Sequence, residues 1–472
     1  GTLQAGGTIT SLGTRTVTLT STGLIDTNGN SVSIAGVMSG AGGLTKNGSG
    51  TLTLSNAANT FSGAVTLNAG TTSVAVLANS GTNSSLGTGA GTPGITLGSA
   101  TAATLLYTGN TTTSNRALML GGAGGGTLQM TAAAQTLTLS GTVTATAGTL
   151  TLDTGTSNAI LTNTSNNFST VQITSGGAIS LVDSNAMTLG SSSLGTLTAR
   201  TLTGNLTLSG NITASGSGDA IVLAAGGNFN NASGFTLTPG TGRWLVYSTD
   251  PTAAGADRGG LVYDFKQYNL AYPGAPTPLT GDGFIYSVAP VITPSLIGTV
   301  SKTHDGTTAV TNLTSANFTT SGIIDADTVT FTFPATGTYN NANVGVGKLV
   351  TADAISIIGA TNGAATVFGY QLAGTLASGN IGTITTESTT VTSEPGVVAA
   401  VTTVATQVVL RDPALVAAPD LITVSLALNT LLPPVSVLPN LDSPDVVISP
   451  WLSVASCGIS LPFTTGAGSC GP

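Results

Sequence analysis

Short stretches of alternating polar and apolar residues recur along the first half of the chain. Within residues 43–72, for example, Leu52 and Leu54 alternate with threonines, and Leu67 follows Thr66 after a turn rich in Asn, Ser and Gly. Such alternation places the leucines on one side of an extended strand and the threonines on the other. A unit of this kind cannot bury its own apolar row, so similar units must stack above and below it, as in a solenoid.

The same alternation continues to residue 240, and turns rich in Asn and Gly separate the stretches. We therefore predict an all-β fold in which residues 1–240 form the rod of a parallel β-helix, a β-solenoid with roughly 20 residues per rung. We expect the glycine-rich segment 121–126 to protrude from this rod as a loop. The leucines predicted to face the interior are Leu52, Leu54, Leu67, Leu137, Leu139, Leu206 and Leu208.

Aromatic residues concentrate abruptly in residues 241–290. Two interpretations are open for this segment. It is either a surface on which aromatic rings contact a sugar, or a cap that closes the apolar end of the solenoid, which stacked repeats require. We favour the cap or connector. The candidate surface-contact residues under the first interpretation are Trp244, Tyr247, Tyr263 and Tyr268.

The last part of the chain, residues 389–472, combines aliphatic runs with many prolines. Proline at this density forbids a continuous helix or a central strand, so we predict an extended, apolar tail. Its two cysteines, Cys457 and Cys470, are the only ones in the chain and are expected to form a disulfide in an oxidising compartment. A loop of this length contributes about 3 kcal/mol of stability.

Charge is scarce and unevenly distributed. Only 6% of residues are charged and the net charge is −8, yet residues 1–240 carry four basic and four acidic side chains, so the whole excess lies after residue 240. Because residues 1–240 are neutral and the residues after 240 are acidic, the chain lacks the basic face that binding to nucleic acid requires. This charge distribution also argues against binding to anionic lipid headgroups through charge.

Few residues could support catalysis or hold a metal. The sole histidine is His304, and the carboxylates of the first half are far apart in the sequence, so we assign no catalytic, cofactor-binding or metal-binding residue. Asp325 and Asp327 could contact calcium, but the segment lacks the set of oxygen ligands that a calcium loop needs. We expect this Asp-Ala-Asp segment to be a solvated turn.

Two segments resemble known families. Residues 43–63, with Gly43, Lys46, Gly50 and Asn59 in the pattern GLTK-x-G-x-GTLTLS, resemble the autotransporter-associated β-strand repeat, with Phe61 at a position where that family has Tyr. Residues 166–190 are similar to the rung repeat of filamentous-haemagglutinin-like exoproteins of Gram-negative bacteria.

A further segment, residues 302–308, resembles the K-x-YDGTT signature of the YDG domain, with His304 in place of its Tyr. This resemblance implies a small β-sandwich-like module over residues 291–388.

The resemblances imply a right-handed β-helix in a secreted, non-catalytic protein of the bacterial cell surface, associated with the outer membrane. Its expected role is adhesion to cells, other bacteria or matrix through an unknown receptor or glycan. The alternatives are a structural subunit of an extracellular filament or surface layer and, third, a glycan-active enzyme. The C-terminal tail would engage an outer-membrane transporter or neighbouring copies of the chain. The disulfide loop would hold the chain at the outer membrane, contact a neighbouring copy during assembly, or only stabilise the C-terminus.

Overall fold

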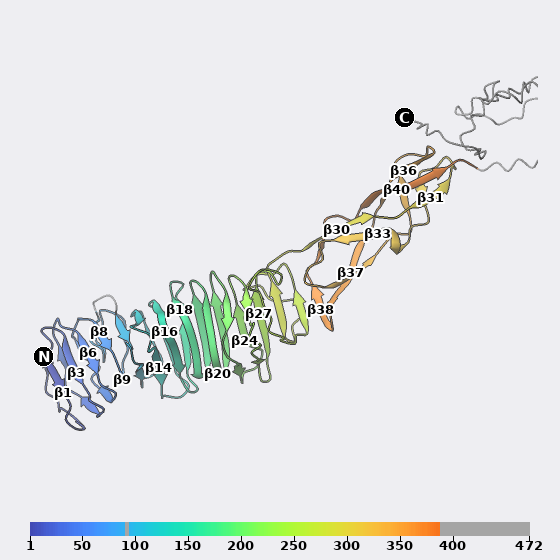
Figure 1. Ribbon diagram of the computed structural model, residues 1–472. Coiled ribbons are helices and arrows are strands. Elements are labelled where there is room, and N and C mark those ends of the chain that lie inside the picture. Colours follow the sequence, from blue (N-terminus) through green and yellow to red (C-terminus); the bar gives the residue numbers. More distant parts are fainter. Residues whose placement is uncertain (90–93, 388–472) are drawn as a thin grey trace, which may run out of the picture. The chain divides into compact units, whose positions relative to one another are not determined.

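The structure is a computed structural model that describes residues 1–89 and 94–387. In this part of the chain every regular element is a β-strand, apart from the short 3-10 helix η1 (Ser315–Asn317). Parallel strands stack rung upon rung, as Figure 1 shows from β1 (Thr2–Gln4) to β27 (Arg243–Ser248). The predicted all-β solenoid is confirmed. Within the same described ranges, no helix is long and apolar enough to cross a membrane.

Strands of successive rungs stack in three rows. The first row comprises β1 (Thr2–Gln4), β3 (Gly23–Asp26), β6 (Leu44–Asn47), β8 (Val65–Leu67), β10 (Ile95–Leu97), β13 (Leu118–Leu120), β22 (Leu206–Leu208) and β25 (Phe229–Asn230). The second comprises β4 (Val32–Ile34), β7 (Thr51–Leu54), β9 (Gly70–Val74), β11 (Ala103–Tyr107), β14 (Gly126–Met130), β23 (Ile212–Ala214) and β26 (Leu237–Thr238). Three long strands bend across both rows, namely β16 (Val143–Asp153), β18 (Asn167–Ser175) and β20 (Met187–Leu194).

The third row begins later in the chain. It comprises β12 (Thr112–Ser114), β15 (Thr136–Leu139), β17 (Asn158–Leu161), β19 (Ala178–Asp183), β21 (Thr196–Thr201), β24 (Asp219–Ala224), β27 (Arg243–Ser248), β29 (Gly283–Tyr286) and β28 (Phe265–Gln267). In the first rungs a short pair, β2 (Val17–Thr18) and β5 (Met38–Ser39), lies apart from the other rows.

The length of a rung follows from the register of the parallel pairs. Leu44 pairs with Val65, 21 residues on, and Ile179 pairs with Leu197, 18 residues on. Because identical faces lie above one another, the alternating leucines form continuous columns inside the stack. All seven leucines predicted to point inward are buried, with at most 3% of each residue exposed. That prediction is confirmed.

Lys46 shows how the solenoid treats the few charges of its first half. The side chain is fully buried, and Nζ donates hydrogen bonds to the carbonyl oxygens of Gly48 (2.7 Å) and Ala69 (2.8 Å), which belong to neighbouring turns. Burial lowers the pKa of Lys46 to about 8, against an opposing effect of the Asp26 carboxylate. The buried ammonium group therefore links the turns that contain Gly48 and Ala69 through hydrogen bonds inside the solenoid.

One rung is longer than the others around it, and a second buried cation secures it. Val65 pairs with Ile95, 30 residues on, so this rung carries an excursion. Arg116 is 2% exposed, and its guanidinium donates to the carbonyl oxygens of Ala78 (2.9 Å) and Gly87 (2.5 Å) within that excursion. A buried guanidinium satisfies several carbonyl groups at once because its donors are fixed in a fork.

The glycine-rich segment 121–126 forms a tight turn, and our expectation of a protruding loop is wrong. A Cβ atom on Gly122 would lie 2.4 Å from the carbonyl oxygen of Ser99, and one on Gly124 would lie 2.4 Å from the carbonyl carbon of Thr101. The glycines are thus needed because the turn stacks directly on the backbone of the preceding rung. The next strand, β14, begins at the last glycine of the segment.

Residues 291–387 build two smaller sheets and extend the third row. The first small sheet comprises β33 (Phe318–Ser321), β30 (Val291–Leu296) and β39 (Gln371–Leu372). The second comprises β31 (Val300–Thr303), β40 (Ala377–Thr385), β36 (Gly345–Ala352), β35 (Gly337–Tyr339) and β32 (Ala309–Val310). A separate apolar core, which includes Phe318, Tyr339 and Val350, lies among these strands.

The remaining strands, β38 (Ala365–Phe368), β37 (Ser356–Asn362) and β34 (Thr328–Thr332), continue the third row of the solenoid, because β38 pairs in parallel with β28. The boundary between the solenoid and the next segment is therefore crossed by one continuous sheet. Residues 388–472, with the predicted tail and the predicted Cys457–Cys470 disulfide, lie outside the described residues, and both stay predictions.

Candidate functional site

The four aromatic residues singled out in the sequence do not form one exposed surface. Trp244 and Tyr268 belong to the main apolar core, with 2% and 1% of their surface exposed. Tyr247, 5% exposed, lies on the opposite face of β27, and its hydroxyl donates to the carbonyl oxygen of Gly274. Tyr263 is half-buried.

This distribution has a simple cause. Successive side chains on β27 point to opposite faces of the sheet, so Trp244 faces the solenoid interior and Tyr247 faces outward. The outward face is covered by residues 270–281, in which Tyr272 packs edge-on against Tyr247 at 5.2 Å between ring centroids. Aromatic side chains therefore pack on both faces of the sheet at β27.

A buried charge network joins the end of the solenoid to the segment that follows. Lys266 on β28 is fully buried, and its Nζ lies 2.5 Å from Asp325 Oδ2 and 2.5 Å from Asp327 Oδ1. Asp327 Oδ2 accepts hydrogen bonds from the hydroxyls of Tyr268 and Tyr370, each at 2.8 Å. The Asp-Ala-Asp segment is therefore not a solvated turn, and that expectation is wrong, because both carboxylates are needed to neutralise buried cations.

Arg258 completes the network. Its guanidinium donates two hydrogen bonds to the Asp325 carboxylate, at 2.6 and 3.0 Å, in the paired geometry that makes such contacts strong. Burial alone would lower the pKa of Arg258, but the hydrogen bond and charge of Asp325 outweigh it and raise the pKa. Burial would likewise raise the pKa of Asp325, but hydrogen bonds from Arg258 and Lys266 hold it below its usual value. Both groups are therefore ionised at neutral pH.

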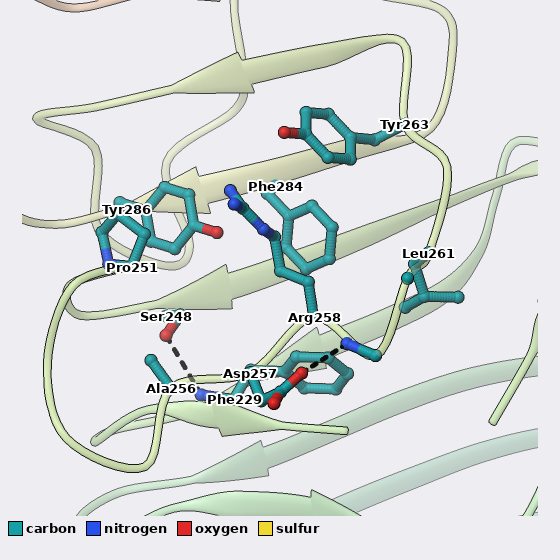
Figure 2. A pocket seen from close by; sticks show the side chains of 12 residues that line it. Phe229, Ser248, Pro251, Ala256, Asp257, Arg258, Leu261, Tyr263, Phe284 and Tyr286 are labelled. Atoms are coloured by element: carbon teal, nitrogen blue, oxygen red, sulfur yellow. Dashed lines mark hydrogen bonds between the residues drawn. The ribbon is translucent and has the colours of Figure 1, made fainter. Parts of the chain in front are cut away.

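A cavity of about 440 Å³ opens beside Arg258 (Figure 2). The guanidinium lies over the rings of Tyr263 and Phe284, at 5.5 and 6.0 Å from their centroids. The residues that line the cavity are Phe229, Ser248, Pro251, Ala256, Asp257, Arg258, Gly259, Gly260, Leu261, Tyr263, Phe284 and Tyr286. Of the four aromatic residues singled out in the sequence, Tyr263 alone lines this cavity.

The other candidate groups do not gather into a reactive site. His304 is exposed, and in the same segment Lys302 Nζ donates to Asp305 Oδ1 and to the carbonyl oxygen of Thr307, each at 2.7 Å. This contact fixes a turn. Among the residues that the structure describes, no three His, Cys, Asp or Glu side chains come together as metal ligands would.

Comparison with known proteins identifies two segments. Residues 44–74, which run from β6 to β9, match the passenger-associated-transport-repeat, and residues 289–375 match the YDG domain. The chain is also 41% identical over 115 residues to the adhesin BmaC autotransporter of Brucella suis biovar 1 (strain 1330). This chain resembles an autotransporter adhesin. The aligned stretch covers 24% of the chain and 3% of that adhesin, and no solved structure matches.

Sequence reasoning missed the charge network of Lys266, Arg258, Asp325 and Asp327. The available signal was the sudden appearance of charged residues after residue 240 in a chain that has so few before it. In a chain that is 6% charged, two cations in an aromatic segment and two carboxylates in the YDG domain are candidates for mutual pairing. The similarity to filamentous-haemagglutinin-like repeats stays a prediction.

Proposed function

We propose that this chain is a non-catalytic part of a secreted bacterial surface protein that acts in adhesion to cells, other bacteria or matrix. The observation that carries the proposal is the stretch that is 41% identical to an autotransporter adhesin. The passenger repeat at residues 44–74 supports it independently, since it lies within regular rungs of the solenoid. In this proposal the solenoid is a scaffold that holds binding surfaces away from the cell.

The surface of the solenoid is compatible with such a scaffold role. Its first 240 residues carry as many basic as acidic side chains, and two of the four cations, Lys46 and Arg116, are buried in contact with backbone carbonyls. Few charged groups remain on the outside to attract non-specific partners through long-range electrostatics. Selective binding of a partner would then depend on short-range contacts at particular places on the surface instead of on long-range charge.

The proposed partners are an outer-membrane transporter and a receptor on the target surface, and the proposed location is the bacterial cell surface. An outer-membrane transporter would export the chain, and the C-terminal tail would hold it at the outer membrane or contact neighbouring copies. The receptor would be a protein or glycan on the target surface. Assembly into a filament or layer is the alternative for the same tail, and the experiment below separates the two.

The test uses beads coated with the full chain and beads coated with an unrelated protein of similar net charge. We expect the first set to adhere in larger numbers to cultured cells, bacteria or matrix proteins, and to be displaced by soluble chain. Equal adherence of both sets on all three surfaces would refute the adhesive role. Negative-stain microscopy of the purified chain, if it showed regular polymers, would favour the filament. Turnover of a polysaccharide would refute the non-catalytic assignment.

A further inference from the structure

The cavity beside Arg258 has the composition of a binding site for a small polar molecule. Apolar walls come from Pro251, Leu261 and the ring of Tyr263, while Arg258 and Asp257 supply polar groups. Its volume of about 440 Å³ lies within the range of small-molecule sites, which runs from about 300 to 1,000 Å³. A few fixed polar groups among aromatic walls are typical of sites that orient a ligand.

Arg258 is held in place before any ligand arrives. Two of its N–H groups donate to the Asp325 carboxylate, and that carboxylate is itself fixed by Lys266. The edge of the guanidinium that faces Tyr286 lies along the cavity, and the Tyr286 hydroxyl points toward it (Figure 2). Burial raises the pKa of Tyr286, so its hydroxyl stays protonated at neutral pH and is able to donate a hydrogen bond.

The rim of the cavity is a turn that leaves polar groups accessible. Asp257 is exposed and its Oδ1 accepts a hydrogen bond from the backbone N–H of Gly259 at 2.7 Å, which fixes the carboxylate at the edge (Figure 2). Gly260 has a φ of +74° and no atom within 4 Å of where its Cβ would lie, so the backbone turns here with open space beside it. A ligand could therefore reach both the carboxylate and the cavity floor.

The balance of charge around the cavity argues against an anionic ligand. The positive charge of Arg258 is matched by Asp325, and that of Lys266 is matched by Asp327. The Asp257 carboxylate then adds a negative charge at the rim, so the site as a whole repels anions. A neutral molecule that carries several hydroxyl groups and one apolar face satisfies these conditions.

We propose that this cavity binds a neutral saccharide unit, with one pyranose face packed on the part of the Tyr263 ring that the Arg258 guanidinium leaves uncovered. The axial C–H groups of a pyranose form an apolar face that suits an aromatic ring. Its hydroxyls would exchange hydrogen bonds with Asp257, Arg258 and Tyr286, whose donors and acceptors are complementary to them. This inference deepens the proposed adhesive function and rests on it for the biological source of the sugar.

Three consecutive residues allow a matched test, because Leu261 and Tyr263 line the cavity while Val262 is 88% exposed and does not. Saturation-transfer NMR and calorimetry of the full chain would use the methyl glycosides of glucose, galactose, mannose and N-acetylglucosamine as probes. We expect one of them to bind. Tyr263→Ala should weaken this binding at least tenfold, and Val262→Ala should change it less than twofold.

Two conservative variants keep the test informative if Tyr263→Ala disturbs the fold. Tyr263→Phe keeps the ring and loses only a hydroxyl that already contacts Asn362, so binding should change less than about threefold. Asp257→Asn keeps an oxygen for the N–H of Gly259 but removes the charge, and we expect it to weaken a neutral glycoside several-fold. Binding of methyl glucuronide alone, strengthened by Asp257→Asn, would overturn the assignment of a neutral sugar.

The outcomes for the cavity and for adhesion are separable. If no glycoside binds, or if Val262→Ala weakens binding as much as Tyr263→Ala, the saccharide inference is refuted, whatever the coated beads do. If a glycoside binds as described and the coated beads adhere to no surface, the inference stands and the adhesive role is refuted. Loss of both glycoside binding and bead adherence in Tyr263→Ala alone would support the two together.

Discussion

Removing the charge of Lys266 tests whether the buried network holds the solenoid to the YDG domain. In Lys266→Met a side chain of similar length keeps the packing, but Asp325 and Asp327 are left with Arg258 as the one remaining cation of the network. Breaking a buried ion pair by removing one partner costs about 3–5 kcal/mol. Because Lys266 is fully buried, little of this cost is relieved by solvent.

The assay uses Trp244, which lies in the last rungs with its ring 5.0 Å from Phe284. Trp451, outside the described residues, is the only other tryptophan, so a Trp451→Phe background makes fluorescence specific for the junction. With a denaturant slope of about 2 kcal/mol per M urea, the expected loss lowers the urea midpoint by roughly 1.5–2.5 M. Lys302→Met removes a more exposed lysine paired with an exposed carboxylate and is the matched control, in which the midpoint should move little.

A double-mutant cycle sharpens the result. Asp327→Asn added to Lys266→Met removes the charge left unpaired, so the double variant should be more stable than the sum of the single losses implies. The network should also fail in acid. The folded-state pKa of Asp325 is below its unfolded value, so its contribution is full above about pH 4 and is lost as pH falls through the folded pKa. A shift under about 1 kcal/mol in Lys266→Met, or strictly additive losses, would refute this account.

Three further predictions concern the solenoid. Leu52→Asp places a charge in a fully buried position and should destabilise its rungs by several kcal/mol, seen as loss of β-sheet circular dichroism and new proteolytic cleavage, whereas Thr53→Ser should be nearly neutral. Gly50→Ala puts a Cβ 1.9 Å from a backbone oxygen of the adjacent rung and should cost about 1–3 kcal/mol in urea unfolding, while Gly6→Ala, with open space around it, should cost nothing. Because burial lowers the pKa of Lys46 to about 8 from 10.5, the unfolded chain binds more protons between these values, and stability should rise with pH across that window. The rise should be absent in Lys46→Met, and equal urea midpoints of the two chains at every pH would contradict this reasoning.

The solenoid was predictable because its signal is local. Alternation of Leu52 and Leu54 with threonines determines which side chains face inward, and any chain with that period must stack similar units to cover them. The interior positions followed directly from this rule. The turn at 121–126 was not predictable in the same way, because glycine permits both an open loop and a tight stacked turn, and the choice depends on the rung below.

The charge network and the cavity depend on contacts that no local pattern reports. Lys266 and Asp327 are 61 residues apart, and the Asp-Ala-Asp segment has the composition of an ordinary exposed turn. Likewise, the high aromatic content of residues 241–290 indicated a segment that differs from the repeats before it, but it did not indicate which rings would face the interior. Trp244 and Tyr247 lie on opposite faces of one strand, and only the position of residues 270–281 determines that the outer face is also covered.

The single sheet that runs from β27 through β29 and β28 into β38 has a mechanical consequence. Hydrogen bonds between stacked strands lie along the stack, so tension applied between its two ends loads the rungs in series. Within the described residues, three strand rows share that load between the middle rungs, whereas three residue pairs, Phe265–Thr366 to Gln267–Phe368, continue the sheet across the junction. Tension across the junction is therefore carried by these three pairs together with the buried contacts of Lys266 and Arg258 to Asp325 and Asp327. Resistance to pulling at this point depends on side chains as much as on the strand ladder, unlike in the middle rungs.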